Sequence, residues 1–102
     1  MTSYLQLDTI INMLITWDDR KNETNIKKHG ISFEEAQTVI THPLSLVNLN
    51  DHPDGNRMEY LGHSIESNLL YVVTVEKNEE EIRLISARKA TSSERSQYEK
   101  GI

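Results

Sequence analysis

Positively charged side chains gather in the last fifth of the chain. Residues 82–102 hold five cations and two acids, whereas the whole chain has a formal net charge of −5. The cations are Arg83, Arg88, Lys89, Arg95 and Lys100. Arginine and lysine bind phosphate oxygens, so this stretch suits a polyanionic ligand. The same cations could instead form the solvated rim of an ordinary small domain, because the net charge itself opposes attraction to nucleic acid.

The histidines do not form a metal-binding pattern. His42, His52 and His63 belong to separate predicted turns or loops, and no HxxxH or carboxylate spacing gathers them. The chain has no cysteine, which excludes disulfides and thiolate metal sites. We therefore expect neither a metal nor a cofactor.

The length and composition predict one soluble domain. A chain of 102 residues can bury a single core. No apolar run approaches the roughly 20 residues of a membrane-spanning helix, and the N-terminus lacks the features of a signal peptide. We expect a cytoplasmic protein without a membrane partner. Residues 1–12 fit the domain poorly and are expected to form an N-terminal extension, either disordered or a short helix, before a domain at 13–102.

Two helices are predicted after a short β-prone run at 13–17. Asp18 can cap a first helix, which ends at Gly30 because glycine readily adopts the left-handed conformation found there. Ser32 and Glu35 have the spacing of a capping box, which predicts the start of a second helix.

The rest of the chain predicts four strands and a final helix. The strand patterns occupy residues 44–49, 57–62, 69–75 and 82–87. The third is apolar almost throughout, so we expect it near the middle of the sheet. Thr91 and Glu94 repeat the capping-box pattern and begin the last helix. The order is β-α-α-β-β-β-β-α, an α+β fold with a mainly antiparallel sheet and packed helices.

Two runs of residues, one near each end of the predicted domain, form a specific sequence pattern. The first is W-D-x-x-K-x-x-x-N-x-x-K-H-G at 17–30, and the second is I-S-A-R-K-A-T at 85–91, followed by Glu94 and Tyr98. Together they resemble the BrnT family, the small ribonuclease toxins of bacterial type II toxin–antitoxin pairs. The resemblance covers about residues 14–101.

The resemblance implies a fold similar to RelE-type toxins and an RNA substrate whose cleavage arrests translation. It also implies a cognate antitoxin, a small dimeric DNA-binding protein that neutralises the toxin in a heterotetramer. DNA would then be contacted only through the antitoxin. The C-terminal stretch is less basic here than is usual in the family.

Cleavage of RNA without a metal uses the 2′-hydroxyl of the substrate as nucleophile. The protein must orient the phosphodiester, stabilise the charge of the transition state and move two protons. The candidates for contacting the reacting phosphate are Arg57, Arg83, Arg88 and Lys89, which would meet if their strands share a sheet. The candidates for binding RNA more broadly are Lys28, Arg88, Lys89 and Arg95.

The candidates for proton transfer are His29, Glu59 and Tyr98. His29 has a suitable ordinary pKa, although it also suits the C-terminal end of a helix. Tyr98 could contact a base or phosphate, or simply cover the sheet. Glu94 is assigned to its capping box rather than to catalysis.

Two other functions remain open. A weakened family member could keep the fold and bind an antitoxin without cutting RNA, as the reduced basic character suggests. Direct binding of DNA by this chain is disfavoured by the net charge and by the lack of a helix-turn-helix or basic arm.

Overall fold

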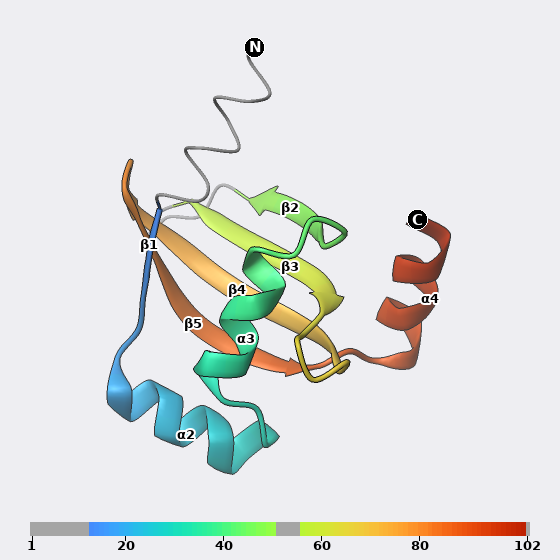
Figure 1. The fold of residues 1–102 in the computed structure, drawn as a ribbon, viewed down its shortest axis with the longest axis horizontal. Helices are drawn as coiled ribbons and strands as arrows, with labels where there is room; N and C mark the ends of the chain where they lie inside the picture. The colour runs from blue at the N-terminus through green and yellow to red at the C-terminus, as the bar shows by residue number, and fades with distance from the viewer. Residues whose placement is uncertain (1–12, 51–55, 102) are drawn as a thin grey trace.

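The computed structural model describes residues 13–50 and 56–101. The predicted extension at 1–12 therefore lies outside the described residues. The predicted order of strands and helices is confirmed (Figure 1). The elements are β1 (Leu14–Thr16), α2 (Asp19–His29), α3 (Phe33–Ile40), β2 (Leu46–Asn50), β3 (Arg57–His63), β4 (Leu69–Asn78), β5 (Glu81–Lys89) and α4 (Ser92–Gly101).

The strands form one five-stranded sheet in the order β1-β5-β4-β3-β2. β1 runs parallel to β5, and the other neighbours are antiparallel. β4 lies at the centre, as its apolar sequence predicts. The sheet is therefore mainly antiparallel, and the prediction of a single α+β domain is confirmed.

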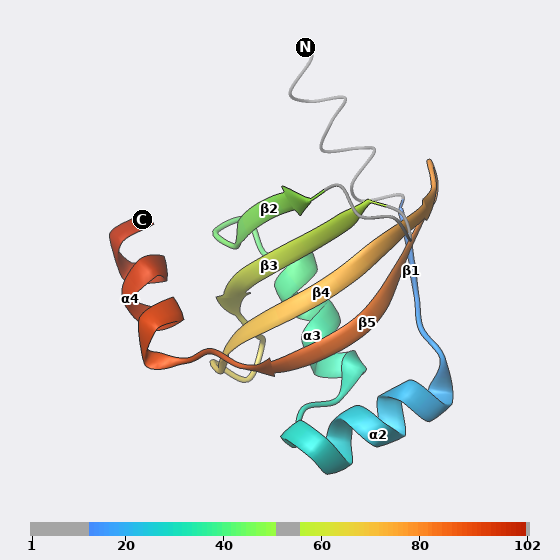
Figure 2. The ribbon, with the colours of Figure 1, turned by 180° about the vertical axis from the view of Figure 1, so that it is seen from behind.

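One face of the sheet carries the main core. α3 lies across this face in Figure 1, and it lies behind the sheet in Figure 2. Phe33, Ala36 and Val39 of α3 are fully buried against Val72 and Leu84 of the sheet. We name this side the helix face. The opposite side, seen in Figure 2, is the open face, and no described helix lies across its middle.

α2 runs beside the edge of β5 that β1 leaves unpaired. Asn25 is buried there. Its side-chain amide makes hydrogen bonds with both the N–H and the carbonyl of Ala87, in place of the backbone of a neighbouring strand. Its Nδ2 donates to the Ala87 carbonyl at 2.7 Å, and the Ala87 N–H donates to Oδ1 at 3.2 Å. Nδ2 also donates to the carbonyl of Ile31 at 2.8 Å. Asn25 is one of the residues in the W-D-x-x-K-x-x-x-N-x-x-K-H-G run, and these hydrogen bonds give it a structural role.

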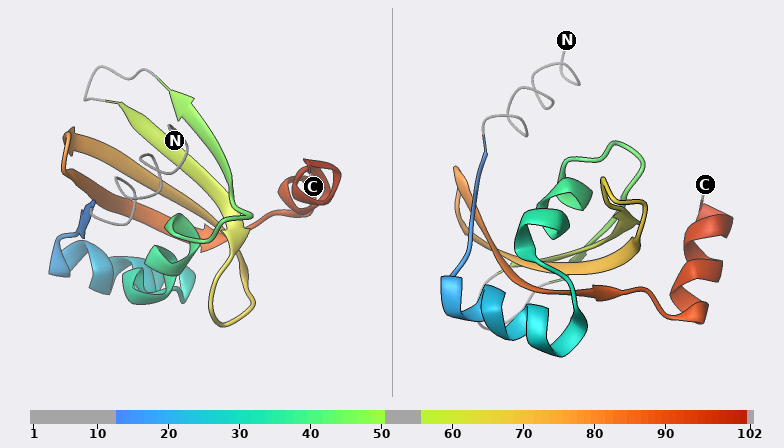
Figure 3. Two further views of the ribbon diagram at one scale, coloured as in Figure 1. Left: turned by 45° about the horizontal axis from the view of Figure 1, so that its top comes forward. Right: turned by 60° about the horizontal axis from the view of Figure 1, so that its bottom comes forward.

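α4 lies beyond the end of β5, away from α2 and α3 (Figure 3). Tyr98 anchors it against Leu61 and Leu69 in a second, smaller cluster of buried residues. The predicted capping box is confirmed in both directions. The N–H of Glu94 donates to the Thr91 hydroxyl at 3.1 Å, and the N–H of Thr91 donates to the Glu94 carboxylate at 2.9 Å.

The capping box predicted at the start of α3 is only half correct. The N–H of Glu35 does donate to Ser32 Oγ at 3.0 Å. The Glu35 carboxylate instead accepts hydrogen bonds from Ser64 at 2.6 Å and Asn68 at 2.8 Å. These bonds tie α3 to the turn between β3 and β4, a contact between distant residues that local spacing cannot reveal.

The second correction concerns the length of β5. The strand continues through Arg88 and Lys89, which the sequence pattern had placed after the strand. Residues of a strand alternate between its two faces, so these two neighbours point to opposite sides of the sheet. Arg88 and Lys89, both candidates for contacting the phosphate, therefore do not share one face of the sheet.

Candidate active site on the open face

Three of the predicted cations share the open face. Residues aligned on neighbouring strands point to the same side of a sheet. One aligned row contains Arg57, Val75 and Arg83, and another contains Leu61, Tyr71 and Arg88. The row between them contains Glu59, Val73 and Ser86. The structure therefore brings together Arg57, Glu59, Arg83 and Arg88 on one surface.

A β-bulge at Ile85 makes this possible. Arg88 lies five positions after Arg83, so a regular strand would direct the two side chains to opposite faces. The register between β4 and β5 shifts between Val73 and Thr74, and Ile85 is left without a partner. The extra residue reverses the alternation and turns both arginines to the open face.

Arg57 and Arg83 are separated by one strand, which puts their backbones about 10 Å apart. In both residues Nε is buried and has no hydrogen-bond partner among the residues that the structure describes. Arg83 makes an ion pair with Glu81 at 3.6 Å, and Glu81 also accepts from the Thr16 hydroxyl at 2.7 Å. The two guanidinium groups can therefore reach a common anion between them.

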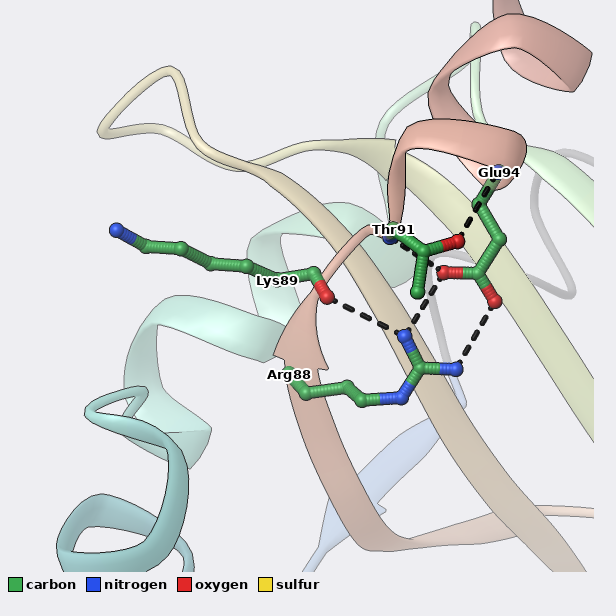
Figure 4. Close-up of polar contacts among 4 residues, drawn as sticks. All are labelled: Arg88, Lys89, Thr91 and Glu94. Carbon is green, nitrogen blue, oxygen red and sulfur yellow. Dashed lines mark hydrogen bonds and ion pairs between the residues drawn. The ribbon is translucent and has the colours of Figure 1, made fainter.

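Arg88 is held firmly by neighbouring side chains (Figure 4). Its two terminal nitrogens donate to the two oxygens of Glu94 at 2.8 and 2.9 Å, and Nη1 also donates to the Lys89 carbonyl. The guanidinium carbon lies 4.4 Å from the centre of the Tyr71 ring. The hydrogen bonds from Arg88, together with the capping contacts, lower the pKa of Glu94 to about 2. Arg88 thus has a structural role that sequence reasoning missed.

Lys89 extends away from this cluster, as Figure 4 shows. Its backbone pairs with Leu70, a residue of the helix face. Its charge helps to lower the pKa of Glu35, where hydrogen bonds and this charge together outweigh the opposite effect of burial. Lys89 therefore serves the helix face rather than the surface that carries Arg88.

Tyr71 and Glu59 complete the open face. Burial, together with the carboxylate of Glu59, raises the pKa of Tyr71 to about 12, so the phenol keeps its proton at neutral pH. Glu59 accepts a hydrogen bond from Asn48 at 3.3 Å. Sequence reasoning missed Tyr71 because it lies within an apolar run. The sequence signal for it was alternation: Tyr71 lies between Leu70 and Val72, so its side chain points to the opposite face of the strand.

The other predicted residues lie elsewhere. Lys28 and His29 are exposed at the end of α2 and line a separate depression of about 300 Å³ beside Ser86. Tyr98 is buried, with its ring centre 5.3 Å from that of His63. Arg95 lies exposed next to it on α4. Tyr98 packs under α4 at the far end of the open face, Lys28 and His29 lie beside α2, and none of these side chains is aligned with Arg57 and Arg83.

Within the described ranges, no helix is long and apolar enough to cross a membrane. No group of three or more histidine or carboxylate side chains gathers there as a metal-binding cluster.

Comparison with known proteins identifies relatives of this chain. The family model described as "Ribonuclease toxin, BrnT, of type II toxin-antitoxin system" matches residues 17–94. The crystal structure of the Brucella abortus ribonuclease toxin BrnT superposes with a TM-score of 0.63 at 27% sequence identity. That match covers 78% of this chain and 99% of the Brucella chain. No curated protein sequence matches.

The fold and these matches define the class of protein as a ribonuclease toxin of a type II toxin–antitoxin system. The chain belongs to the BrnT family, since the family model covers most of its length. The resemblance stated from the two sequence runs is confirmed.

Proposed function

We propose that the open face cleaves RNA by attack of the substrate 2′-hydroxyl on the adjacent phosphate, without a metal. The observation that carries this proposal is the pair of arginines Arg57 and Arg83. Both have a buried Nε without a partner among the described residues, and both face the same side as Glu59. A buried guanidinium nitrogen is costly to leave unpaired, so a phosphate that draws these side chains towards it would satisfy their donors.

The neighbouring side chains supply the remaining roles. Arg57 and Arg83 hold the phosphate and offset the charge of the transition state. Glu59 lies one row away and accepts the proton of the 2′-hydroxyl. Tyr71, which is protonated at neutral pH, gives its phenolic proton to the leaving 5′-oxygen as the bond to phosphorus breaks. Arg88 orients the Tyr71 ring at the end of the surface nearest α4.

The wider role follows from the family. We propose that cleavage inhibits translation in the cytoplasm and that a dimeric DNA-binding antitoxin neutralises the toxin in a heterotetramer. A RelE-like relationship of the fold is part of the same proposal. We also propose that residues 13–102 suffice for folding and cleavage, because the strands and helices of the described domain begin at Leu14. A chain starting at Met13 should then match the full chain in thermal stability and RNA cleavage.

The central test is cleavage of a labelled RNA by purified protein in the presence of EDTA. Replacing Arg57 and Arg83 together by alanine should lower the rate by at least about 10²-fold. Arg20→Ala on α2 is the matched control and should cut as the wild type does. Loss of cleavage in EDTA, or full activity in the double variant, would contradict the proposed mechanism.

A second candidate function rests on Arg88. Both of its terminal nitrogens are occupied by Glu94, so it is less available to RNA than its position suggests. A protein with this arrangement could bind an antitoxin without cutting RNA. Purified protein that leaves RNA intact but forms a stable complex with the product of the neighbouring antitoxin gene would support that alternative.

A further inference from the structure

A cavity of about 530 Å³ opens on the open face beside the proposed catalytic row. Leu46 and Leu61 form its apolar part, and Tyr71 forms an aromatic wall. Asn48 of β2 and Gln97 of α4 contribute amide groups from opposite sides. The cavity thus lies where the sheet meets α4.

The charges around the cavity favour an uncharged ligand. Among the described residues that line it, Glu59 and Glu94 are the carboxylates and none is a cation. Arg88 neutralises Glu94 from outside, while Arg57 and Arg83 lie on the far side of the Glu59 row. A phosphate group would be repelled here and drawn to the arginines, whereas a neutral group attached to that phosphate could enter.

The side chains match the chemistry of a nucleic-acid base. Proteins that read single-stranded RNA stack unstacked bases on aromatic rings and bind the base edges with polar side chains. Amides serve this purpose because each offers a donor and an acceptor. Within the described part of the chain, the Gln97 amide makes no hydrogen bond, and Asn48 makes one, to Glu59. The volume lies within the range of about 300–1,000 Å³ of small-ligand sites.

We propose that this cavity binds a single unstacked base of the RNA, next to the phosphate that is cut, and that Asn48 and Gln97 select the base. This inference rests on the proposed function, because it identifies the part of the substrate that the same surface reads. Tyr71 joins the two regions, since its ring lines the cavity and its hydroxyl interacts with Glu59.

The first test is sequencing of the cut ends of a random-sequence RNA. Wild-type protein should show unequal base frequencies at one position beside the cut. The double variant N48A/Q97A should reduce that preference about threefold to tenfold, which corresponds to the loss of one or two hydrogen bonds. Gln37→Ala on α3 is the matched control and should keep the wild-type preference. Both positions of the double variant are exposed, and thermal melting verifies that it is folded.

The second test measures binding without cleavage. Trinucleotides with a 2′-deoxyribose at the cleavage position cannot be cut, and fluorescence anisotropy gives their affinities for each of the four bases. Base discrimination that N48A/Q97A abolishes would support the subsite even if the protein proved unable to cut RNA. Cleavage whose base preference survives in the double variant would overturn the subsite and leave the proposed function standing. Equal affinities for all four bases, with equal frequencies at the cut ends, would also overturn it.

Discussion

Glu94 serves two purposes through one carboxylate. It closes the capping box of α4 by accepting from the Thr91 N–H, and it binds both terminal nitrogens of Arg88. The hydrogen bonds from Arg88 are the largest cause of its low pKa. The position of α4 on the sheet and the orientation of Arg88 therefore depend on the same charge.

Replacing Glu94 by glutamine should destabilise the protein at neutral pH by about 2 kcal/mol, because Arg88 loses its charged acceptor. The pKa of Glu94 falls from 4.5 to about 2 on folding, so its stabilisation is present above pH 4.5 and is lost as the pH falls to about 2. Urea unfolding at several pH values measures this difference between wild type and variant. Glu99→Gln, an exposed position on the same helix, is the control. A difference that does not shrink towards pH 2 would contradict the assignment.

Replacing Tyr71 by phenylalanine removes the hydroxyl but keeps the ring beneath Arg88. We expect RNA cleavage to slow by about 10²-fold while the protein stays folded, because a proton donor is lost. Tyr60→Phe makes the same chemical change on the helix face and should cut normally. Single-turnover cleavage rates compare the three proteins. Unchanged cleavage by the Tyr71 variant would exclude the hydroxyl from the mechanism.

At the scale of elements, β5 decides the composition of the site. Its bulge at Ile85 brings Arg83 to the face of Arg88, and its continuation through Lys89 sends that lysine to the other side. The edge of the same strand holds α2 through Asn25. β5 thus links the open face, the helix face and the first helix.

Replacing Asn25 by aspartate tests the link between α2 and β5. The carboxylate can still accept from the Ala87 N–H, but it cannot donate to the carbonyls of Ala87 and Ile31. We expect a loss of about 2–3 kcal/mol in the free energy of unfolding, since buried groups lose their partners. Asn56→Ala removes an exposed amide contact and should cost less than about 0.5 kcal/mol. Chemical denaturation gives both values, and similar losses would refute the role of Asn25.

The whole molecule combines a net charge of −5 with three arginines on the open face, two of which pair with Glu81 and Glu94. Arginines from β3 and β5 meet there across the central strand, whereas acidic residues crowd the hairpin that joins β4 to β5. Binding of RNA should therefore depend on a few local contacts rather than on the overall potential of the protein.

The salt dependence of RNA binding measures the number of these contacts. For a single strand, each neutralised phosphate contributes about 0.7 to the slope of log affinity against log salt. Because Arg57 and Arg83 are proposed to hold the same phosphate, the variant lacking both should lower that slope by about 0.7, whereas Arg20→Ala should leave it unchanged. Fluorescence anisotropy with an uncleavable RNA between 50 and 200 mM salt, a range of about fourfold, provides the slopes. An unchanged slope in the double variant would show that these arginines do not contact phosphate.

Much of the fold follows from the sequence alone. Caps at Asp18, Gly30 and Thr91, together with the apolar run of β4, predict the order of the elements and the central strand. These signals depend on contacts within a few residues, so they can be recognised locally. Glu59 and the individual arginines could be proposed as candidates from the sequence, because their chemistry is a property of the residue type.

Only the tertiary structure decided which of these residues share a surface. The bulge at Ile85 depends on the pairing of β5 with β4, and no pattern within β5 marks it. The buried role of Tyr98 and the engagement of Arg88 by Glu94 depend on where α4 packs. The C-terminal cations are divided between the two faces of the sheet: Arg83 and Arg88 face one side with Arg57, whereas Lys89 faces the other. Strand alternation and register, which neighbouring strands set, decide this division.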